Sequence, residues 1–164
     1  MLILVCGLPG SGKSFFARTL SKQLHARYYN SDLLRKELFP NNRTYSEQEK
    51  QTVYSTLLSI AENDLKDQYT VIIDATFYEN SLRIPFYQLT EKLTCKLYIF
   101  YIQANEDLIK ERTSIKRTDS EADFNVYLTL KNKFEPIDRA FLSLISEQNN
   151  IDKLIHSALL YLTS

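Results

Sequence analysis

Short apolar runs alternate along the chain with longer segments in which apolar residues recur at helical spacing. Leu2–Cys6 is an uninterrupted apolar run, as expected for a parallel strand covered on both faces. Other short segments have the length and the β-branched or aromatic content of strands. The predicted strands are Leu2–Cys6, Arg27–Asn30, Thr70–Ile73, Lys96–Ile102 and Lys153–His156.

Between these runs, apolar residues return at every third or fourth position, which is the period of a helix with one buried face. Phe16, Ala17, Leu20 and Leu24 form the first such stripe. Ser46 followed three residues later by a glutamate fits a capping box, which starts a helix. The predicted helices cover residues 13–24, 32–39, 46–65, 81–93, 105–115, 121–134 and 158–162.

Strands that alternate with helices predict an α/β fold, because a parallel sheet needs helical connections that cover both of its faces. We therefore expect a three-layer α/β/α arrangement around a parallel five-stranded sheet. The 164 residues suit one domain, so residues 1–164 are assigned to a single unit. The polar stretch Ser114–Ala122 is the candidate mobile insertion, and it predicts a small helical lid at about residues 105–122.

Charge and cysteine content argue against several classes of protein. Lys+Arg and Asp+Glu number 20 each, so the formal net charge is zero, which disfavours coating of nucleic acid through an overall positive field. Cys6 lies in an apolar run and Cys95 stands two residues before one, and both are expected to be buried reduced thiols. The apolar runs are too short for a signal peptide or a membrane span. We expect a cytoplasmic protein without membrane contact, and no obligate protein partner is indicated.

The segment GLPGSGKS, after the first predicted strand, fits the phosphate-loop pattern G-x-x-x-x-G-K-[ST]. It contains all three glycines of the chain, which indicates a backbone that residues with a Cβ adopt poorly. Such a loop wraps a phosphate with its N–H groups, and the following helix adds its positive end. A nucleoside triphosphate such as ATP is the predicted ligand, with Lys13 on its β- and γ-phosphates and Ser14 on Mg²⁺. The predicted nucleotide-binding residues are Gly7, Leu8, Pro9, Gly10, Ser11, Gly12, Lys13 and Ser14.

Asp32 and Arg35 follow the second predicted strand, three residues apart. Ligands of open parallel sheets bind beyond the carboxyl ends of the strands, so both side chains are expected beside the phosphate loop on one face of a helix. Asp32 can accept a proton from a hydroxyl, and Arg35 can hold an anionic part of the acceptor. The alternative is structural, with Asn30, Ser31 or Asp32 as a helix cap and Arg35 in a surface ion pair.

The third predicted strand is followed by Asp74, as in the Walker-B segment whose acid holds Mg²⁺ through water. Asp74 is therefore a candidate metal-binding residue, with capping of the turn or contact with the acceptor as alternatives. Arg83, nine residues later, is a candidate for the same cleft. Phe77 and Tyr78 are candidates for stacking on a base, with core packing as the alternative.

A basic cluster, formed by Lys110, Arg112, Lys116 and Arg117, stands beside a polar stretch. Phosphoryl transfer needs positive charge where the transferred phosphate develops its charge, and closing lids often supply it. Arg117 and Arg112 are the candidate catalytic arginines of the lid, and Arg112 is also a candidate nucleotide-binding residue. The alternative is a solvated helix face, because acidic side chains flank the cluster.

Taken together, these motifs resemble the P-loop kinase family that contains polynucleotide 5′-kinases and the zeta-toxin-like and gluconate-kinase-like small kinases. Four segments carry the resemblance in order: GLPGSGKS, NSDLLRKEL, VIIDATF with a downstream arginine, and ERTSIKRTDSEADFNVYLTLKNKFEP. The resemblance implies a nucleoside-kinase-like P-loop NTPase fold. It also implies that Asp32 is the general base, that Arg35 contacts the acceptor's phosphate, and that Arg117 contacts the transferred phosphate.

The combined prediction is an ATP- and Mg²⁺-dependent kinase that transfers the γ-phosphate to a hydroxyl. A nucleic-acid or nucleotide 5′-hydroxyl is the first predicted acceptor. A small molecule, either a sugar acid or a nucleotide sugar, is the alternative. A regulatory module that binds nucleotide without catalysis is a third hypothesis, and it would need loops ordered by the γ-phosphate.

Overall fold

The computed structural model describes residues 1–115 and 122–163. The strands are β1 (Leu2–Cys6), β2 (Arg27–Asn30), β3 (Val71–Asp74), β4 (Leu97–Gln103) and β5 (Leu142–Ile145). The helices are α1 (Lys13–Leu24), α2 (Ser31–Leu38), α3 (Glu47–Lys66), α4 (Asn80–Lys92), α5 (Glu106–Ser114), α6 (Phe124–Lys133) and α7 (Ile151–Thr163).

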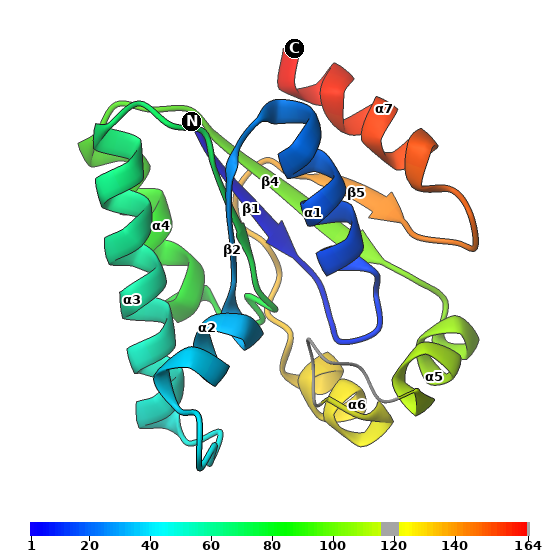
Figure 1. Ribbon diagram of the computed structural model, residues 1–164. Coiled ribbons are helices and arrows are strands. Elements are labelled where there is room, and N and C mark those ends of the chain that lie inside the picture. Colours follow the sequence, from blue (N-terminus) through cyan, green and yellow to red (C-terminus); the bar gives the residue numbers. More distant parts are fainter. Residues whose placement is uncertain (116–121, 164) are drawn as a thin grey trace.

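All strand pairs are parallel, and the order across the sheet is β2-β3-β1-β4-β5 (Figure 1). β1 is central, and its five residues are buried. Because parallel strands end at the same edge, the register brings Asn30 beside Asp74 and Asp74 beside Val5. The phosphate loop therefore begins next to the carboxyl end of β3, and the carboxyl end of β2 lies one strand further across the sheet.

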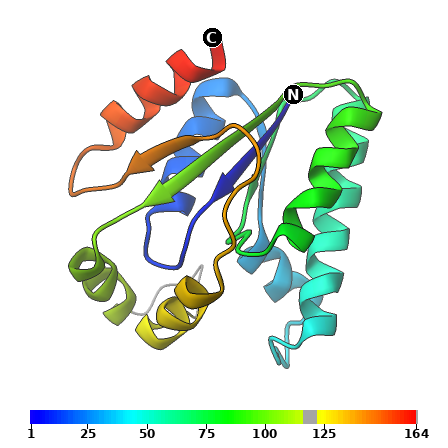
Figure 2. The ribbon, with the colours of Figure 1, turned by 180° about the vertical axis from the view of Figure 1, so that it is seen from behind.

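Helices cover both faces of the sheet, with α3 and α4 on one face and α1 and α7 on the other (Figure 2). Alternate residues of β1 supply the two cores: Leu2 and Leu4 pack towards α3 and α4, and Ile3 and Val5 pack towards α1 and α7. This alternation follows from the two-residue period of a strand. The predicted three-layer α/β/α fold is confirmed. Figure 1 shows α2, α5 and α6 gathered at the edge where β1 ends.

The prediction of a fifth strand at Lys153–His156 is wrong. These residues belong to α7, whose buried residues Leu154, Ile155 and Ala158 have the spacing of one helical face. The fifth strand is instead Leu142–Ile145, at the edge of the sheet beside β4. Only Leu144 of this strand is buried, because an edge strand has a neighbour on one side, and a four-residue segment of this kind carries a weak sequence signal.

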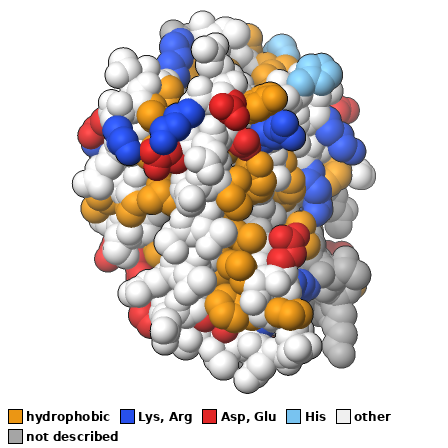
Figure 3. Space-filling model, turned by 60° about the vertical axis from the view of Figure 1, so that its left-hand side comes forward, with side chains coloured by type: hydrophobic (Ala, Val, Ile, Leu, Met, Phe, Trp, Pro, Cys, Tyr) orange, Lys and Arg blue, Asp and Glu red, His pale blue; other side chains and the backbone are white. Residues whose placement is uncertain are grey.

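One face of the molecule carries charges of both signs, as the zero formal net charge predicts (Figure 3). Figure 3 shows lysine and arginine side chains intermixed with aspartate and glutamate side chains on one face of the molecule. Within residues 1–115 and 122–163, no helix combines the length and the apolar character needed to cross a bilayer.

Candidate active site

The loop between β1 and α1 has a backbone that only glycine adopts easily. Gly12 has φ +90°, and a Cβ at this position would lie 2.7 Å from Ser146 Oγ. A Cβ on Gly7 would lie 2.5 Å from the carbonyl oxygen of Ile102. α1 starts directly after Gly12, and the first N–H groups of a helix have no acceptor inside it. The loop therefore presents backbone donors and the positive end of a helix dipole to an anion.

A cavity of about 730 Å³ lies between this loop, the start of α1 and the 146–151 segment that joins β5 to α7. We call it the α7 cavity. Arg112 of α5 lines it, and the guanidinium donates to Gly10 O at 3.3 Å, Ser146 Oγ at 3.1 Å and Glu147 O at 3.4 Å. Arg112 thus connects α5 to both walls of the cavity. Arg117 and Lys116 lie outside the described residues.

A second cavity, of about 380 Å³, is lined by side chains from α2, α3 and α6 and by the turn after β3. We call it the α2 cavity. Its lining includes Asp32 and Arg35, which the sequence analysis selected, and also Lys50, Tyr54 and Tyr78. Lys13 lines both the α7 cavity and the α2 cavity. The phosphate-loop lysine therefore stands where two ligand-sized spaces meet.

Asp32 lies in the first turn of α2, but it is not the helix cap. The cap is Asn30, whose Oδ1 accepts hydrogen bonds from Asp32 N at 3.0 Å and Leu33 N at 2.9 Å. Burial raises the pKa of the Asp32 carboxyl, the positive charge of Lys13 opposes this rise, and the negative charge of Asp74 adds to it. A carboxylate of this kind holds a proton more readily than an exposed aspartate, as a general base requires.

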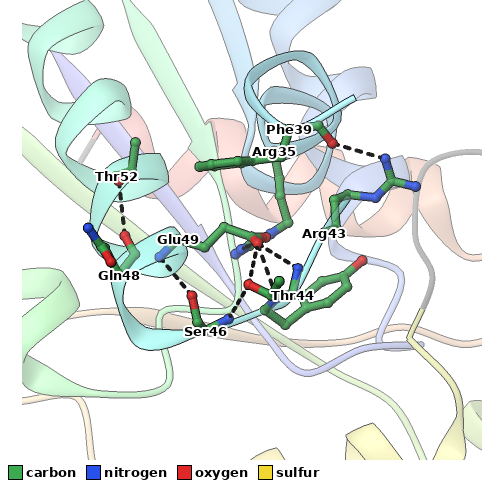
Figure 4. Close-up of polar contacts among 9 residues, drawn as sticks. Arg35, Phe39, Arg43, Thr44, Ser46, Gln48, Glu49 and Thr52 are labelled. Atoms are coloured by element: carbon green, nitrogen blue, oxygen red, sulfur yellow. Dashed lines mark hydrogen bonds and ion pairs between the residues drawn. The ribbon is translucent and has the colours of Figure 1, made fainter. Parts of the chain in front are cut away.

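Arg35 is buried and forms an ion pair with the equally buried Glu49, with 2.8 Å between Nη1 and Oε1 (Figure 4). The Oε2 atom of Glu49 accepts from Thr44 N at 2.7 Å, Thr44 Oγ1 at 3.0 Å and Tyr45 N at 3.2 Å. The Ser46 half of the predicted capping box is confirmed, since its Oγ accepts from Glu49 N at 3.3 Å. The other half differs, because Ser46 N donates to Thr44 Oγ1 instead of to the Glu49 carboxylate. The ion pair of Arg35 is thus buried, whereas the structural alternative in the sequence analysis was a surface ion pair. Arg35 Nε is also buried, and it has no hydrogen-bond partner among the described residues.

Ser14, Asn30, Asp74 and Tyr28 form a polar cluster at the ends of β2 and β3. Asn30 Nδ2 donates to Asp74 Oδ2 and, at 3.4 Å, to Ser14 Oγ, and Tyr28 OH donates to Asp74 Oδ2 at 2.8 Å. Asp74 Oδ1 is buried without a hydrogen-bond partner among the described residues. A hydroxyl and an unpaired carboxylate oxygen are ligands of the kind that Mg²⁺ prefers, directly or through water, so this cluster fits the predicted metal.

The prediction that Arg83 points into the cleft is wrong. Arg83 is fully buried, and its guanidinium donates to the carbonyl oxygens of Phe77 at 3.0 Å, Glu135 at 3.0 Å and Pro136 at 2.8 Å. It joins the turn after β3 to the segment between α6 and β5. Carbonyl groups satisfy both Nη atoms of this buried cation, whereas Nε has no hydrogen-bond partner among the described residues.

Phe77 and Tyr78 have different positions. Phe77 is fully buried and packs edge-on against Tyr54 and Phe86, so its proposed stacking on a base is wrong and core packing is the outcome. Tyr78 lines the α2 cavity, and its hydroxyl accepts from Lys50 Nζ at 2.7 Å.

Sequence reasoning missed Lys50, Tyr45 and Tyr54 of the α2 cavity and the 146–151 segment of the α7 cavity. No local pattern marks these residues, because they reach the site only through the packing of distant elements. Asn30 had a signal, since it was a candidate cap, but its bonds to Asp74 and Ser14 depend on strand register.

Comparison with known proteins gives the family. A model of the family described as "AAA domain" matches residues 2–137, which is most of the chain and includes the phosphate loop, Asp32 and Asp74. The chain belongs to this AAA domain family. The AAA domain match also confirms the predicted membership of the P-loop small kinases.

One relative of this AAA domain protein is the L-seryl-tRNA(Sec) kinase of Methanococcus maripaludis, 27% identical over 117 residues, which cover 68% of this chain and 44% of the relative. The matched part is thus less than half of that kinase. The Mycobacterium tuberculosis APS kinase CysC, solved with AMPPNP and APS, has a TM-score of 0.73 at 18% identity and covers 99% of this chain and 97% of its own. Chaetomium thermophilum Kti12, solved with ADP-AlF3, has a TM-score of 0.72 at 20% identity, with 97% of each chain covered. These two structures share the fold.

Proposed function

We propose that this protein is an ATP-dependent phosphotransferase that moves the γ-phosphate of ATP to a hydroxyl group. The observation that carries the proposal is the position of Lys13, which lines both the α7 cavity and the α2 cavity. A kinase needs its donor and acceptor in separate spaces that meet at the transferred phosphate. The α7 cavity suits the nucleotide, and the α2 cavity, which contains Asp32, suits the acceptor.

The triphosphate is held by the backbone amides of residues 7–14, by Lys13 and, on the side of the 146–151 segment, by Arg112. Ser14 and Asp74 are the residues that would hold Mg²⁺, and the metal would neutralise charge on the β- and γ-phosphates. Support for the nucleotide comes from the related folds, which were solved with AMPPNP in one protein and with ADP-AlF3 in another.

The chemical step follows from the position of Asp32. The carboxylate takes the proton of the acceptor hydroxyl, the hydroxyl oxygen bonds to the γ-phosphorus, and the bond from that phosphorus to the β-phosphate oxygen breaks. ADP and a phosphate ester result, and the proton leaves later from Asp32. We assign charge stabilisation in this step to Lys13 and Arg117, and we assign a lid function to α5 and the segment that follows it.

The acceptor site contains aromatic and basic side chains together. Tyr45, Tyr54 and Tyr78 line the α2 cavity with Lys50 and Arg35. The tyrosine rings suit a base, and the two cations, which are paired with Glu79 and Glu49, are the groups that would contact a phosphate. We therefore keep a nucleic-acid or nucleotide hydroxyl as the first acceptor, and the relative that is an L-seryl-tRNA(Sec) kinase supports a nucleic-acid-linked hydroxyl. A sugar acid or a nucleotide sugar is the alternative, since a space of about 380 Å³ also holds a small molecule.

The test is transfer of radiolabelled γ-phosphate from ATP to a panel of acceptors: 5′-hydroxyl oligonucleotides, nucleosides, seryl-tRNA, sugar acids and nucleotide sugars. We expect transfer to one class, dependent on Mg²⁺, and its loss in the Asp32→Asn variant. Calorimetry with ATP is run in parallel. ATP binding without transfer to any acceptor would contradict the kinase proposal and favour a regulatory nucleotide-binding module, and absence of ATP binding would contradict both.

A further inference from the structure

Among the described residues, the Asn30 side chain contacts all three parts of the proposed site: the start of α2, Ser14 and Asp74. Its Oδ1 accepts from the backbone N–H groups at the start of α2, which carries Asp32. Its Nδ2 donates to Asp74 and to Ser14. The residue is buried, and its side chain lies at the end of β2, in register with Asp74. One amide thus links the base, the phosphate loop and the carboxylate after β3.

The helix cap determines which way this amide faces. An N-cap side chain must offer an oxygen to the free N–H groups of the first turn, so Oδ1 faces α2. The NH₂ group then points away from the helix, and it has two hydrogens to donate. The two acceptors, Asp74 Oδ2 and Ser14 Oγ, lie there.

Among the common N-cap residues, asparagine is the one that offers both an oxygen to the first turn of the helix and an N–H donor to Asp74 and Ser14. Aspartate caps a helix equally well but would place an oxygen against Asp74, and serine or threonine caps are too short to reach across. Both the Asp74 carboxylate and the start of α2 therefore favour asparagine at position 30. A residue that only capped α2 would not need a side-chain hydrogen-bond donor.

The bonds to Asp74 leave one carboxylate oxygen available. Oδ2 accepts from Asn30 and from Tyr28, and Oδ1 is buried and accepts from no described residue. A buried carboxylate oxygen without a partner is costly unless a ligand completes it. With Oδ2 held by two donors, the carboxylate cannot turn, and Oδ1 stays directed to one place.

We propose that Asn30, assisted by Tyr28, is a positioning residue that orients the Asp74 carboxylate and the Ser14 hydroxyl for Mg²⁺ and aligns them with Asp32. This inference rests on the proposed function, because it assumes that the site takes a magnesium nucleotide. It assigns to Asn30 an effect on metal use that a helix cap alone would not have.

The test compares nucleotide affinity with and without metal. The Asn30→Ser variant keeps a cap oxygen and loses the donor to Asp74. By calorimetry, we expect its Kd for ATP in EDTA to stay within about threefold of the original protein, and its Kd for ATP in excess Mg²⁺ to rise about tenfold, the size of one lost interaction. Tyr28→Phe removes the other donor to Oδ2 and should give a smaller change in the same direction.

Asn105→Ser is the matched control for capping, because Asn105 caps α5 through a bond from Leu108 N at 2.8 Å. Its loss of thermal stability calibrates what an asparagine-to-serine change costs at a cap. Should Asn30→Ser fail to fold by circular dichroism, the Tyr28→Phe result decides.

The outcomes separate this inference from the function on which it rests. Equal changes of Kd with and without Mg²⁺ in Asn30→Ser would overturn the positioning role and leave a structural cap. Unchanged Mg²⁺ dependence in Tyr28→Phe would likewise overturn the claim that bonds to Oδ2 orient the carboxylate. An original protein that binds no magnesium nucleotide would instead overturn the proposed function.

Discussion

Arg35 and Glu49 form a buried ion pair in which Nη1 and Oε1 are 2.8 Å apart. The pair joins α2 to the start of α3, and Glu49 also accepts hydrogen bonds from the backbone of the connecting loop (Figure 4). One carboxylate thus holds a loop and neutralises a cation on the wall of the α2 cavity.

This pair predicts a large loss of stability in Glu49→Gln. Removing one charge of a buried pair leaves the other uncompensated, which costs about 3 kcal/mol or more. Urea unfolding should show this loss as a lower midpoint with an unchanged slope. Glu47→Gln is the control: Glu47 lies two residues away with an exposed side chain, which pairs with Lys50 Nζ at 2.5 Å. Because Glu79 still pairs with Lys50 in this variant, the unfolding free energy should change by less than about 1 kcal/mol. Equal losses in the two variants would contradict the importance of the buried pair.

Asp32→Asn is predicted to separate binding from chemistry. Asparagine keeps the size of the side chain and cannot take the proton of the acceptor, so the transfer rate should fall roughly 100-fold or more. The Kd for ATP should stay within a few-fold, because Asp32 lines the α2 cavity and not the α7 cavity. Single-turnover transfer and calorimetry measure the two quantities. Normal turnover in the variant would exclude Asp32 as the base.

The raised pKa of Asp32 predicts two linked pH effects. Burial raises the pKa of the folded state, so kcat/KM should decline with falling pH at a value above the ordinary aspartate pKa of about 3.9. The folded state binds the Asp32 proton more tightly than the unfolded state. The protonated carboxyl therefore adds to the free energy of unfolding at pH values below the unfolded-state pKa, and this contribution is lost as the pH rises through the folded-state pKa. Asp32→Asn should therefore be more stable than the original protein at pH 7, with the gain shrinking towards pH 4. A gain independent of pH would contradict this cause.

Substitution by lysine is predicted to lower stability at Arg83 and to weaken ATP binding at Arg112. Arg83→Lys loses bonds to buried carbonyl groups and should lower the unfolding free energy by about 2 kcal/mol, with ATP affinity unchanged within threefold. Arg112→Lys loses the link between the phosphate loop and the 146–151 segment and should raise the KM for ATP about tenfold, with little loss of stability. Thermal unfolding and steady-state kinetics on both variants test the contrast, and a reversed pattern would contradict it.

Much of the fold follows from local patterns. The first four strands and the helical segments between them were predicted close to their observed positions, because buried strands and amphipathic helices have distinct apolar periods. The fifth strand was misplaced, since Leu142–Ile145 is short and lies at an edge, and the apolar residues of 153–156 belong to a helix face. A short edge strand has no distinctive apolar pattern in the sequence, whereas a strand buried on two faces appears as an uninterrupted apolar run.

Alone, the sequence determined the phosphate loop, because a strand, three glycines and a helix start impose that backbone through local sterics. The tertiary structure decided where similar side chains lie and which groups they contact. Arg35 reached a cavity wall and Arg83 a buried set of carbonyl groups, although both are arginines on helices that follow strands. It also gave Asn30 its contacts with Asp74 and Ser14. The physical reason is that a side chain's partners and desolvation come from elements distant in the chain, and only packing brings those together.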